Sequence, residues 1–422
     1  MELKPGYKQT EVGAIPEEWE TPTLDSVAKR GSGHTPNKKH PEYWDGDIKW
    51  VSLKDSDALD RVYIDETAAT ITRAGIANSS AVVHPAGTVV LSRDAGVGKS
   101  AIMKSAMAVS QHFMAWQCGP CLDNHFLYYW LQSEKSEFER IAIGNTIKTI
   151  GLSYFRALNI PLPPLPEQRA IAGVLSDVDE LIGALDQLIG KKRDLKQATM
   201  QQLLTGQKRL PGFHGEWEPR TLRSIVQTPI TDGPHMTPKF LDDGIPFLSV
   251  NNLVDNRIDL SELRFISRED DREFSKKCKP RRGDVLLGKA ASVGKVAIVD
   301  TDFDFNIWSP IALIRVGFGH NSRFVYYQLQ APNLAKQIVL LTNASSQGNI
   351  GMGDIEKLTL QLPAPEEQAA IAEVLTDMDA ELAALEQRRD KTRALKQGMM
   401  QELLTGKTRL VDSGKLKVES NA

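Results

Sequence analysis

The residues with the clearest potential for phosphate chemistry lie in the segment GVGKS at 96–100. A Walker A loop cradles nucleotide phosphates and carries a further glycine, four intervening residues before its Gly-Lys pair, where this chain has Arg93. A similar segment, SVGKV at 292–296, lacks the Ser or Thr that would hold Mg²⁺. We therefore predict a tight turn between two strands in each place. Lys99 and Lys295 would then be exposed at the tips, where either could reach a phosphate.

A pair of cysteines, CGPC at 118–121, has the spacing found in thioredoxin-like redox enzymes. In those enzymes a helix N-terminus lowers the pKa of the first cysteine, and the segment LDNHFLYYW that follows is compatible with such a helix. Zinc is a second possibility, because His112 and His125 would complete a Cys₂His₂ set, but the spacing matches no standard finger. The corresponding segment of the second half, LIRVGFG, contains no cysteine. Free thiols are the preferred interpretation.

No other arrangement of residues suggests catalysis. The histidines show no Ser/His/Asp pattern of recognisable spacing. The (Asp/Asn/Ser)-Pro-Pro-(Tyr/Phe/Trp) motif of amino-methylating DNA methyltransferases is absent, and LPPL at 162–165 is better explained as a proline turn. We therefore expect a chain without catalytic residues, bound metal or cofactor.

Composition limits the class of protein. The chain has 422 residues, which at ~150 per domain suggests two to four domains. Lys and Arg number 51 and Asp and Glu 54, so the formal net charge of −3 excludes a strongly basic, histone-like binder. Three cysteines exclude a disulfide-stapled secreted scaffold, and no run approaches the ~18 apolar residues of a membrane span. We expect a soluble protein of the cytoplasm that does not contact a membrane.

The most informative feature is an internal repeat. Residues 165–210 match residues 365–410 at a constant offset of 200 without a gap, and both copies contain LLTG. Weaker matches precede each copy: GTVVLSRDAGVGKSAI resembles GDVLLGKAASVGKVAI, and FLYYWLQS resembles FVYYQLQA. Both halves therefore follow one plan, a globular region and then a long helix. We place globular regions at 1–162 and 209–362, long helices at 163–208 and 363–410, and a disordered tail at 411–422.

The globular regions are predicted to be mixed α/β. Apolar runs such as IKWVSL, TVVLS, IPFLSV and DVLLGK are bounded by Gly, Pro, Asp and Asn, which is typical of strands. FLYYWLQSEKSEFERIA and FVYYQLQAPNLAKQIVLL have the spacing of helices. The predicted fold class is therefore α+β, with two α/β globular regions joined by two long helices.

The long helices begin with proline and acidic residues and end before Gly206 and Gly406. A helix over 166–205 is ~60 Å long, and its apolar residues recur at steps of three and four, which predicts a seam buried against a partner. The other copy is the natural partner. We predict an antiparallel coiled coil in which a pseudo-twofold axis relates the repeats and the globular regions lie at opposite ends. The predicted seam residues are Ile171, Val174, Val178, Leu181, Leu185, Leu188, Leu195, Ile371, Val374, Met378, Leu382, Leu385, Leu395 and Met399.

These features together resemble the specificity (S) subunit of a type I restriction–modification enzyme. The resemblance extends over the chain to about Leu410. It is carried by segments that close each globular region and open each long helix, and by the segments near the start of each globular region. These are PLPPLPEQRAIAGVL at 161–175, LPAPEEQAAIAEVL at 362–375, GSGHTPNKKHPEYWDGDIKWVSLKD at 31–55 and TDGPHMTPKFLDDGIPFLSVNN at 231–252.

The resemblance implies that each globular region is a target-recognition domain that reads one half of a bipartite DNA sequence. It also implies that the helices fix the spacing of the half-sites and dock two DNA methyltransferase subunits, and that restriction and translocase subunits complete the enzyme. S-adenosylmethionine binding, methyl transfer, translocation and cleavage belong to those partners, so no catalytic residue is carried into this sequence. A rigid spacer could hold two readers on one face of a duplex, about one ~34 Å turn apart.

Local basic clusters are where we expect contact with double-stranded DNA, because cationic side chains neutralise phosphates while Asn, Gln, Arg and His read bases. The loops at 34–39 and 235–239 each follow a glycine and contain Thr-Pro, although loop polarity alone also explains them. For 388–396 a solvated helix face is the preferred interpretation. The candidate DNA-binding residues are His34, Thr35, Asn37, Lys38, Lys39, Arg93, Lys99, Thr146, Lys148, His235, Thr237, Lys239, Lys289, Lys295, Gln347 and Asn349.

Two alternatives remain open. The chain could be a structural coiled-coil adaptor whose end domains bind proteins or RNA, or a specificity subunit that serves a fused nuclease–methyltransferase. Different loops at matching positions of the two copies favour a DNA specificity subunit over an adaptor, because half-sites of different sequence demand different contacts.

Overall fold

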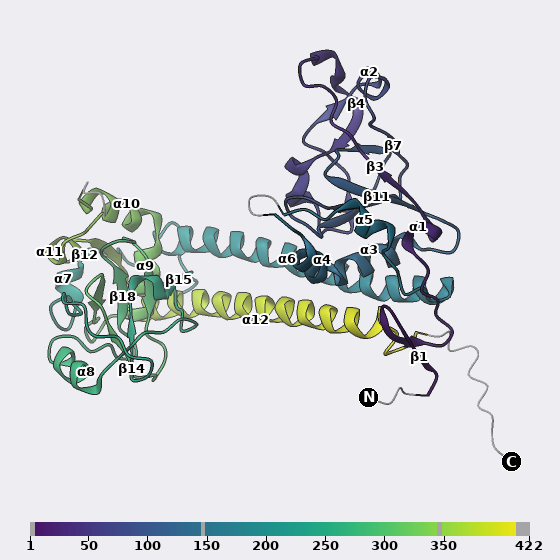
Figure 1. Cartoon of the computed structure of the whole chain (residues 1–422). Coiled ribbons are helices and arrows are strands. Elements are labelled where there is room, and N and C mark those ends of the chain that lie inside the picture. The colour runs from purple at the N-terminus through teal and green to yellow at the C-terminus, as the bar shows by residue number, and fades with distance from the viewer. Residues whose placement is uncertain (1–4, 145–147, 344–347, 411–422) are drawn as a thin grey trace. The chain divides into compact units, whose positions relative to one another are not determined.

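The computed structural model describes residues 5–144, 148–343 and 348–410 (Figure 1). The chain divides into two compact units, one made of Met1–Asp186 with Arg388–Ala422 and the other of Gln187–Gln387. Both divisions fall inside a long helix, either α6 (Leu165–Leu203) or α12 (Pro365–Leu403). Each unit therefore contains one α/β region together with a segment of each long helix.

The α/β region of the first unit contains two larger sheets and a hairpin. One sheet has the strand order β3-β11-β8-β9-β5, and the other has the order β6-β4-β10-β7. The hairpin is formed by β1 (Tyr7–Thr10) and β2 (Gly13–Pro16). The other strands are β3 (Ala28–Ser32), β4 (Trp44–Val51), β5 (Tyr63–Ile64), β6 (Thr70–Ile71), β7 (Val83–His84), β8 (Val89–Ser92), β9 (Ser100–Met103), β10 (Met107–Val109) and β11 (Phe113–Cys118), and the shorter helices are α1 (Leu24–Val27), η1 (Pro41–Tyr43), η2 (Leu53–Ala58), α2 (Arg73–Ala77), α3 (Asn124–Ser133), α4 (Lys135–Ile141) and α5 (Leu152–Arg156).

The α/β region of the second unit follows the same plan with shorter strands. Its sheets have the orders β13-β21-β18-β19 and β17-β14-β20, and two further strand pairs are β12-β22 and β15-β16. The strands are β12 (Glu218–Thr221), β13 (Thr231–Asp232), β14 (Ile245–Leu248), β15 (Leu253–Val254), β16 (Arg257–Ile258), β17 (Phe265–Ile266), β18 (Val285–Gly288), β19 (Val296–Ile298), β20 (Asn306–Ile307), β21 (Ile311–Ile314) and β22 (Thr359–Leu362), and the helices are α7 (Leu222–Ile225), η3 (Val250–Asn252), α8 (Arg268–Ser275), α9 (Ser322–Gln330), α10 (Pro332–Leu341) and α11 (Met352–Ile355).

The predicted α+β class and the predicted local elements are confirmed. The runs around β8 and β18 are strands that are buried along their whole length, as continuous apolar sequence predicts when both faces of a sheet are covered. The two aromatic-rich segments form α3 and α9, each of which packs on its own sheet. Asp123 caps α3 by accepting from the backbone N–H of Phe126, and Asn321 caps α9 by accepting from that of Phe324.

A buried glutamine joins the start of each long helix to the helix of its own α/β region. In the first unit, Oε1 of Gln168 accepts from the backbone N–H of Asp123 at 2.8 Å, and its amide donates to the carbonyl of Pro163. In the second unit, Oε1 of Gln368 accepts from the backbone N–H of Asn321 at 3.0 Å. Because these amides satisfy backbone groups at a helix cap, the glutamine of the repeated motif has a structural role.

The two long helices run antiparallel within each unit, as predicted. In the first unit, Asp179 of α6 pairs with Lys396 of α12, and Asp186, further along α6, pairs with Arg393, which comes earlier in α12. In the second unit, Lys192 pairs with Glu381, while Lys196, further along α6, pairs with Asp379, which comes earlier in α12. The partner number falls as the α6 number rises, which is the signature of antiparallel packing.

The composition of the predicted seam is wrong in part. Leu181, Leu188, Leu195 and Leu395 are 41%, 40%, 53% and 60% exposed. Leu185, which was predicted, and Ile189, which was not, are both buried, and the charged pairs described above also join the two helices. Steps of three and four residues can be drawn through more than one face of these helices, and the pattern alone did not show that lysine and aspartate occupy the contact face.

A tyrosine, an aspartate and a lysine fasten each α/β region to the helix pair of its own unit. In the first unit, the Tyr129 hydroxyl donates to Asp179 at 2.9 Å, and Lys396 bonds the same carboxylate at 2.7 Å while lying over the tyrosine ring. In the second unit, Tyr327 donates to Asp379 at 2.7 Å and Lys196 bonds it at 2.6 Å. Burial foremost raises the pKa of both tyrosines, which keeps them protonated donors.

In each unit a glutamate at the start of a long helix bonds an arginine that lies beside a tryptophan, but the segments that supply the arginine and the tryptophan differ. In the second unit, Arg209 lies 2.5 Å from the Glu367 carboxylate and over the indole of Trp217, and Arg209 and Trp217 belong to one continuous segment. In the first unit, Trp19 from the N-terminal segment and Arg409 from the C-terminal segment meet at Glu167. Two distant segments of the chain therefore make in one unit the contact that a single loop makes in the other.

None of the helices within the described residues has the length and apolar character needed to cross a membrane.

We predict that Asp379→Asn lowers the free energy of unfolding by about 2 kcal/mol, because it removes the charged acceptor shared by Lys196 and Tyr327. Urea denaturation of the full chain, followed by tryptophan fluorescence, measures the change. Asp377→Asn is the matched control, since Asp377 is exposed on the same helix. It should change the free energy by less than ~0.5 kcal/mol. Equal effects of the two substitutions would contradict the anchoring role of Asp379.

Candidate nucleic-acid interface

A loop in each unit begins at a glycine that has no room for a side chain. A Cβ on Gly33 would lie 1.5 Å from the carbonyl oxygen of Val109, and one on Gly233 would lie 1.8 Å from that of Ile307. The start of each loop therefore packs backbone to backbone against the strand beside it, β10 in the first unit and β20 in the second. This contact fixes where the following polar residues emerge.

The two loops expose most of the residues that the sequence singled out. In the first loop (34–39), Thr35 is half-buried, and the Trp50 indole donates to the carbonyl of His34 at 3.1 Å. In both loops the proline of Thr-Pro is buried, so the neighbouring residues stay at the surface. The exposed predicted residues are His34, Asn37, Lys38 and Lys39 in the first unit and His235, Thr237 and Lys239 in the second.

The Gly-Lys segments form tight turns of antiparallel hairpins, as predicted, between β8 and β9 and between β18 and β19. The prediction that their lysines are exposed at the tips is wrong. The Lys99 ammonium donates to the carbonyl of Ser56 at 3.0 Å, and that of Lys295 to the carbonyl of Val250 at 3.5 Å. Both lysines are half-buried, because each ties its hairpin to the nearby 3₁₀ helix.

The first residues of these turns, Arg93 and Lys289, occupy equivalent places. Ser92 pairs with Phe113 and Gly288 with Ile311, so the residues that follow β8 and β18 correspond. Arg93 is half-buried with Nε 3.5 Å from Asp94. Lys289 is only 8% exposed. Lys289 was predicted as a candidate DNA-binding residue, and its ammonium lies 3.1 Å from the Asp232 carboxylate. This ion pair indicates that Lys289 supports the surface.

A chain of hydrogen bonds links the first loop to the turn after β8. Thr35 donates to the Gln111 amide oxygen at 2.6 Å, and the Gln111 amide nitrogen lies 3.3 Å from Nε2 of His112. Nδ1 of His112 lies 2.7 Å from the buried carboxylate of Asp94, which also accepts from the Thr149 hydroxyl. The loop, the turn and the segment at 148–149 therefore form one connected surface.

The corresponding surface of the second unit is organised by Asp232. Its carboxylate lies 2.5 Å from Lys277, 3.1 Å from Lys289 and 3.2 Å from Nε2 of His235. Burial alone would raise the pKa of Asp232, but the bonds with Lys277 and Lys289 outweigh it, so the pKa lies below the usual range. The carboxylate is therefore ionised and holds two lysines in place.

The candidate surface also includes the segment near residue 148 in the first unit and the segment near residue 349 in the second. In the first unit the backbone N–H of Ala95 donates to the carbonyl of Lys148 at 3.3 Å, and in the second unit Asn349 bridges to Ala290. Lys148 and Asn349 are exposed. Two further predicted residues, Thr146 and Gln347, lie outside the described residues.

A hollow of about 660 Å³ lies beside the first loop. Trp44 and Trp50 pack edge to face with ring centroids 5.1 Å apart in its wall, and the exposed side chains of Lys38 and Lys54 reach it. Gln111 and His112 also line it. The hollow therefore combines polar groups that can read a base with cations that can meet phosphate.

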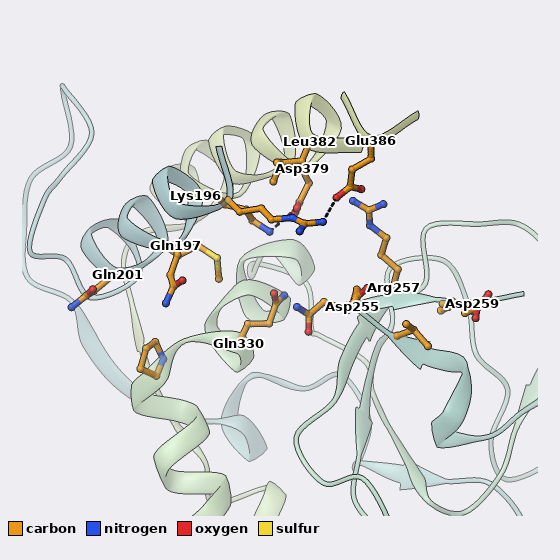
Figure 2. A pocket seen from close by; sticks show the side chains of 16 residues that line it. Lys196, Gln197, Gln201, Asp255, Arg257, Asp259, Gln330, Asp379, Leu382 and Glu386 are labelled. Carbon is orange, nitrogen blue, oxygen red and sulfur yellow. Dashed lines mark hydrogen bonds and ion pairs between the residues drawn. The ribbon is translucent and has the colours of Figure 1, made fainter. Parts of the chain in front are cut away.

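A second cleft, of about 710 Å³, lies in the second unit between the helix pair and the β15–β16 hairpin (Figure 2). Asp255 and Arg257 come from the hairpin, and Lys196 is held by Asp379 on the opposite wall. Three cationic and four acidic side chains line it. This charge mixture does not favour a polyanionic ligand, so the cleft is not part of the candidate interface.

The two cysteines of CGPC are free thiols, as the preferred interpretation held. Burial foremost raises the pKa of the Cys118 thiol to about 12, which is the opposite of an activated thiolate. His112 is engaged with Asp94, and His125 with Tyr63 and Asn124. Among the described residues, no group of three or more His, Cys, Asp or Glu is placed to hold a metal ion.

Several residues of this interface were not identified from the sequence. Gln111, His112 and Asp94 are separated along the chain from the loop they support, and Asp232 and Lys277 become neighbours only through the fold. The one available signal was the cluster KKCKPRR at 276–282, which contains Lys277.

Two solved structures have a similar fold. One is described as the crystal structure of the type I restriction-modification system S subunit from M. genitalium, and it aligns with a TM-score of 0.59 and 16% identity over 95% of this chain and 99% of that one. A second, from a study of complex assembly and conformational transition of the type I R-M system, aligns with a TM-score of 0.57 and 18% identity over 93% and 99%. These likenesses establish the fold.

Sequence comparison establishes the family. The model of the type I restriction modification DNA specificity domain matches residues 16–191 and 214–393, and the chain belongs to this family. The MjaIX specificity subunit of Methanocaldococcus jannaschii is 24% identical over 372 residues, 85% of this chain and 86% of that protein. The MjaVIII specificity subunit of the same organism is 25% identical over 425 residues, 96% of each chain.

We predict that Asp232→Asn lowers the free energy of unfolding by about 3 kcal/mol, because it leaves the buried Lys289 ammonium without a counter-ion. Because the pKa of Asp232 is lowered in the folded chain, its contribution to the free energy of unfolding depends on pH. The contribution of Asp232 is fully present above its unfolded pKa of ~3.9 and is lost as the pH falls through the folded value. Urea denaturation at pH 7 and at acid pH measures both effects.

The matched control is Glu273→Gln, which breaks an exposed pair with Lys276 in the same unit. It should cost less than ~1 kcal/mol and leave the acid dependence unchanged. An Asp232→Asn variant that keeps the acid dependence of the native chain would contradict the assignment.

Proposed function

We propose that this chain is the DNA-sequence specificity subunit of a type I restriction–modification complex. In this proposal residues 1–162 and residues 209–362 each read one half of a bipartite duplex target. The long helices at 163–208 and 363–410 set the spacing between the half-sites and dock methyltransferase subunits.

The proposal rests on one observation: the two units share the same backbone framework but carry different polar side chains at equivalent surface positions. Strand register makes Phe113 equivalent to Ile311, so Gln111 and His112 of the first unit correspond to Ser309 and Pro310 of the second. Asp94 likewise corresponds to Ala290. The buried glutamines, the capped helices and the Tyr–Asp–Lys contacts recur in both units. A shared scaffold with different surface chemistry is what two different half-sites require.

The chain itself supplies recognition and no chemistry in this proposal. Two methyltransferase subunits would carry S-adenosylmethionine and methyl transfer, and restriction and translocase subunits would carry ATP-driven movement and cleavage. The complex would act on chromosomal and incoming DNA in the cytoplasm. The modest net charge of −3 supports a chain that binds DNA tightly only when its partners complete the contact with the backbone.

The proposed DNA contacts fall into two groups. The four cationic side chains of the two Gly-Lys turns are buried or half-buried and bonded within the fold, and they position the surface: Arg93, Lys99, Lys289 and Lys295. Exposed or half-buried residues of the loops and of the segments near residues 148 and 349 contact DNA, and Thr146 and Gln347 remain proposals from sequence. The contacting residues in the described part of the chain are His34, Thr35, Asn37, Lys38, Lys39, Lys148, His235, Thr237, Lys239 and Asn349.

Methylation mapping tests the proposal. The chain is expressed with the methyltransferase subunit encoded beside it in a host that lacks other modification, and the methylated positions of the host DNA are sequenced. We expect a split motif with two short specific parts at a fixed separation. Replacing residues 211–362 by the corresponding region of another specificity subunit should alter one part and leave the other part and the methylation level unchanged. A change in both parts, or in neither, contradicts separate reading by the two regions.

A further inference from the structure

The amide of Gln111 is held by two neighbouring side chains on the surface of the first unit. Its side chain is exposed and lines the hollow beside the first loop, immediately before β11. Thr35 donates to its oxygen at 2.6 Å, and its nitrogen lies 3.3 Å from Nε2 of His112. An amide oxygen has two lone pairs and the amide nitrogen two hydrogens. Among residues 5–144 and 148–343 the Gln111 amide has no other hydrogen-bond partner, so one acceptor site and one N–H can face a ligand.

A buried carboxylate holds the imidazole that lies beside this amide. Asp94 is 8% exposed, and its Oδ2 lies 2.7 Å from Nδ1 of His112. A carboxylate oxygen accepts, so Nδ1 of His112 donates to Asp94 and the imidazole ring is held in place. The Thr35 hydroxyl donates to the amide oxygen of Gln111, so the amide nitrogen faces Nε2 of His112. Thr149 donates to the other carboxylate oxygen of Asp94 and fixes it further.

The order of the free groups matches one base. Adenine presents the N7 acceptor and the N6 amino donor side by side in the major groove, and a glutamine amide meets both with its N–H and its oxygen. Guanine presents two acceptors there, and cytosine and thymine lack the pair. Resting on the proposed function, we infer that Gln111 reads one adenine in the half-site recognised by residues 1–162, with Asp94 and His112 as positioning residues.

The surroundings of Gln111 suit a duplex. Lys38 and Lys54 are exposed and line the same hollow, where they can meet the phosphates that flank a base. The Trp50 indole holds the carbonyl of His34 at 3.1 Å and so keeps Thr35 in position. The second unit has Ser309 and Pro310 at the equivalent places, and its described residues form no such relay. The inferred adenine contact is therefore specific to one of the two half-sites.

The test is methylation mapping of the assembled complex with Gln111→Glu and Gln111→Ala. A carboxylate accepts from the cytosine amino group. We therefore expect Gln111→Glu to change one adenine of one motif part to cytosine, with a shift in preference of about fivefold to 150-fold. Gln111→Ala should relax that position to several bases by a similar factor. The other motif part should stay unchanged in both variants.

Two controls separate reading from folding. Gln117→Glu makes the same change at an exposed glutamine within β11, away from the hollow, and should leave the motif unchanged. Asp94→Asn removes the carboxylate that holds His112 beside the Gln111 amide and should relax the same single position as Gln111→Ala, whereas a merely structural role would lower methylation evenly at all sites.

The outcomes distinguish a failure of the adenine assignment from a failure of the proposed function. A split motif that keeps its adenine in both Gln111 variants overturns the adenine assignment while leaving the proposed function intact. Loss of methylation at every site in both variants also overturns it, because one base contact accounts for only about fivefold to 150-fold. A native chain that yields no split motif overturns the proposed function itself.

Discussion

A carboxylate that accepts from a tyrosine hydroxyl and a lysine ammonium at once is the contact on which the architecture depends. Asp179 makes it in the first unit and Asp379 in the second. In each case the tyrosine belongs to the α/β region, the aspartate to the helix that follows that region, and the lysine to the opposite helix. One charged group therefore joins three elements, and the half-buried setting makes each bond stronger than it would be in water.

The two copies of the repeat share their internal framework and differ in the side chains of their surface loops and turns. Buried glutamines, helix caps and strand register recur in both units, and they lie where a substitution would leave polar groups unsatisfied. The side chains at the loops and turns do not recur. A relay through His112 on one surface is replaced on the other by a carboxylate, Asp232, that gathers two lysines. The same backbone thus presents two chemistries, which is how one scaffold can address two sequences.

The helices and strands could be predicted from the sequence, whereas the networks of hydrogen bonds and ion pairs could not. The repeat, the strands around β8 and β18 and the antiparallel helices follow from periodicity and turn chemistry, which act locally. Leu188 and Leu195 were assigned to the seam because a pattern of apolar steps does not show which face is buried. Lys99 and Lys295 were expected to be free because their carbonyl partners lie some 40 residues away along the chain, as the pairs with Ser56 and Val250 show. Such partners are set by tertiary packing.

The central claim is that two unlike surfaces on one framework meet different parts of one duplex. Site-specific photocrosslinking tests it directly, with a photoreactive residue placed at position 38 or at position 239 in the complex assembled with its methyltransferase subunits on the target duplex. The account predicts that position 38 crosslinks only to one specific part of the target and position 239 only to the other. Crosslinks from both positions to the same part, or from neither position to the duplex, would contradict it.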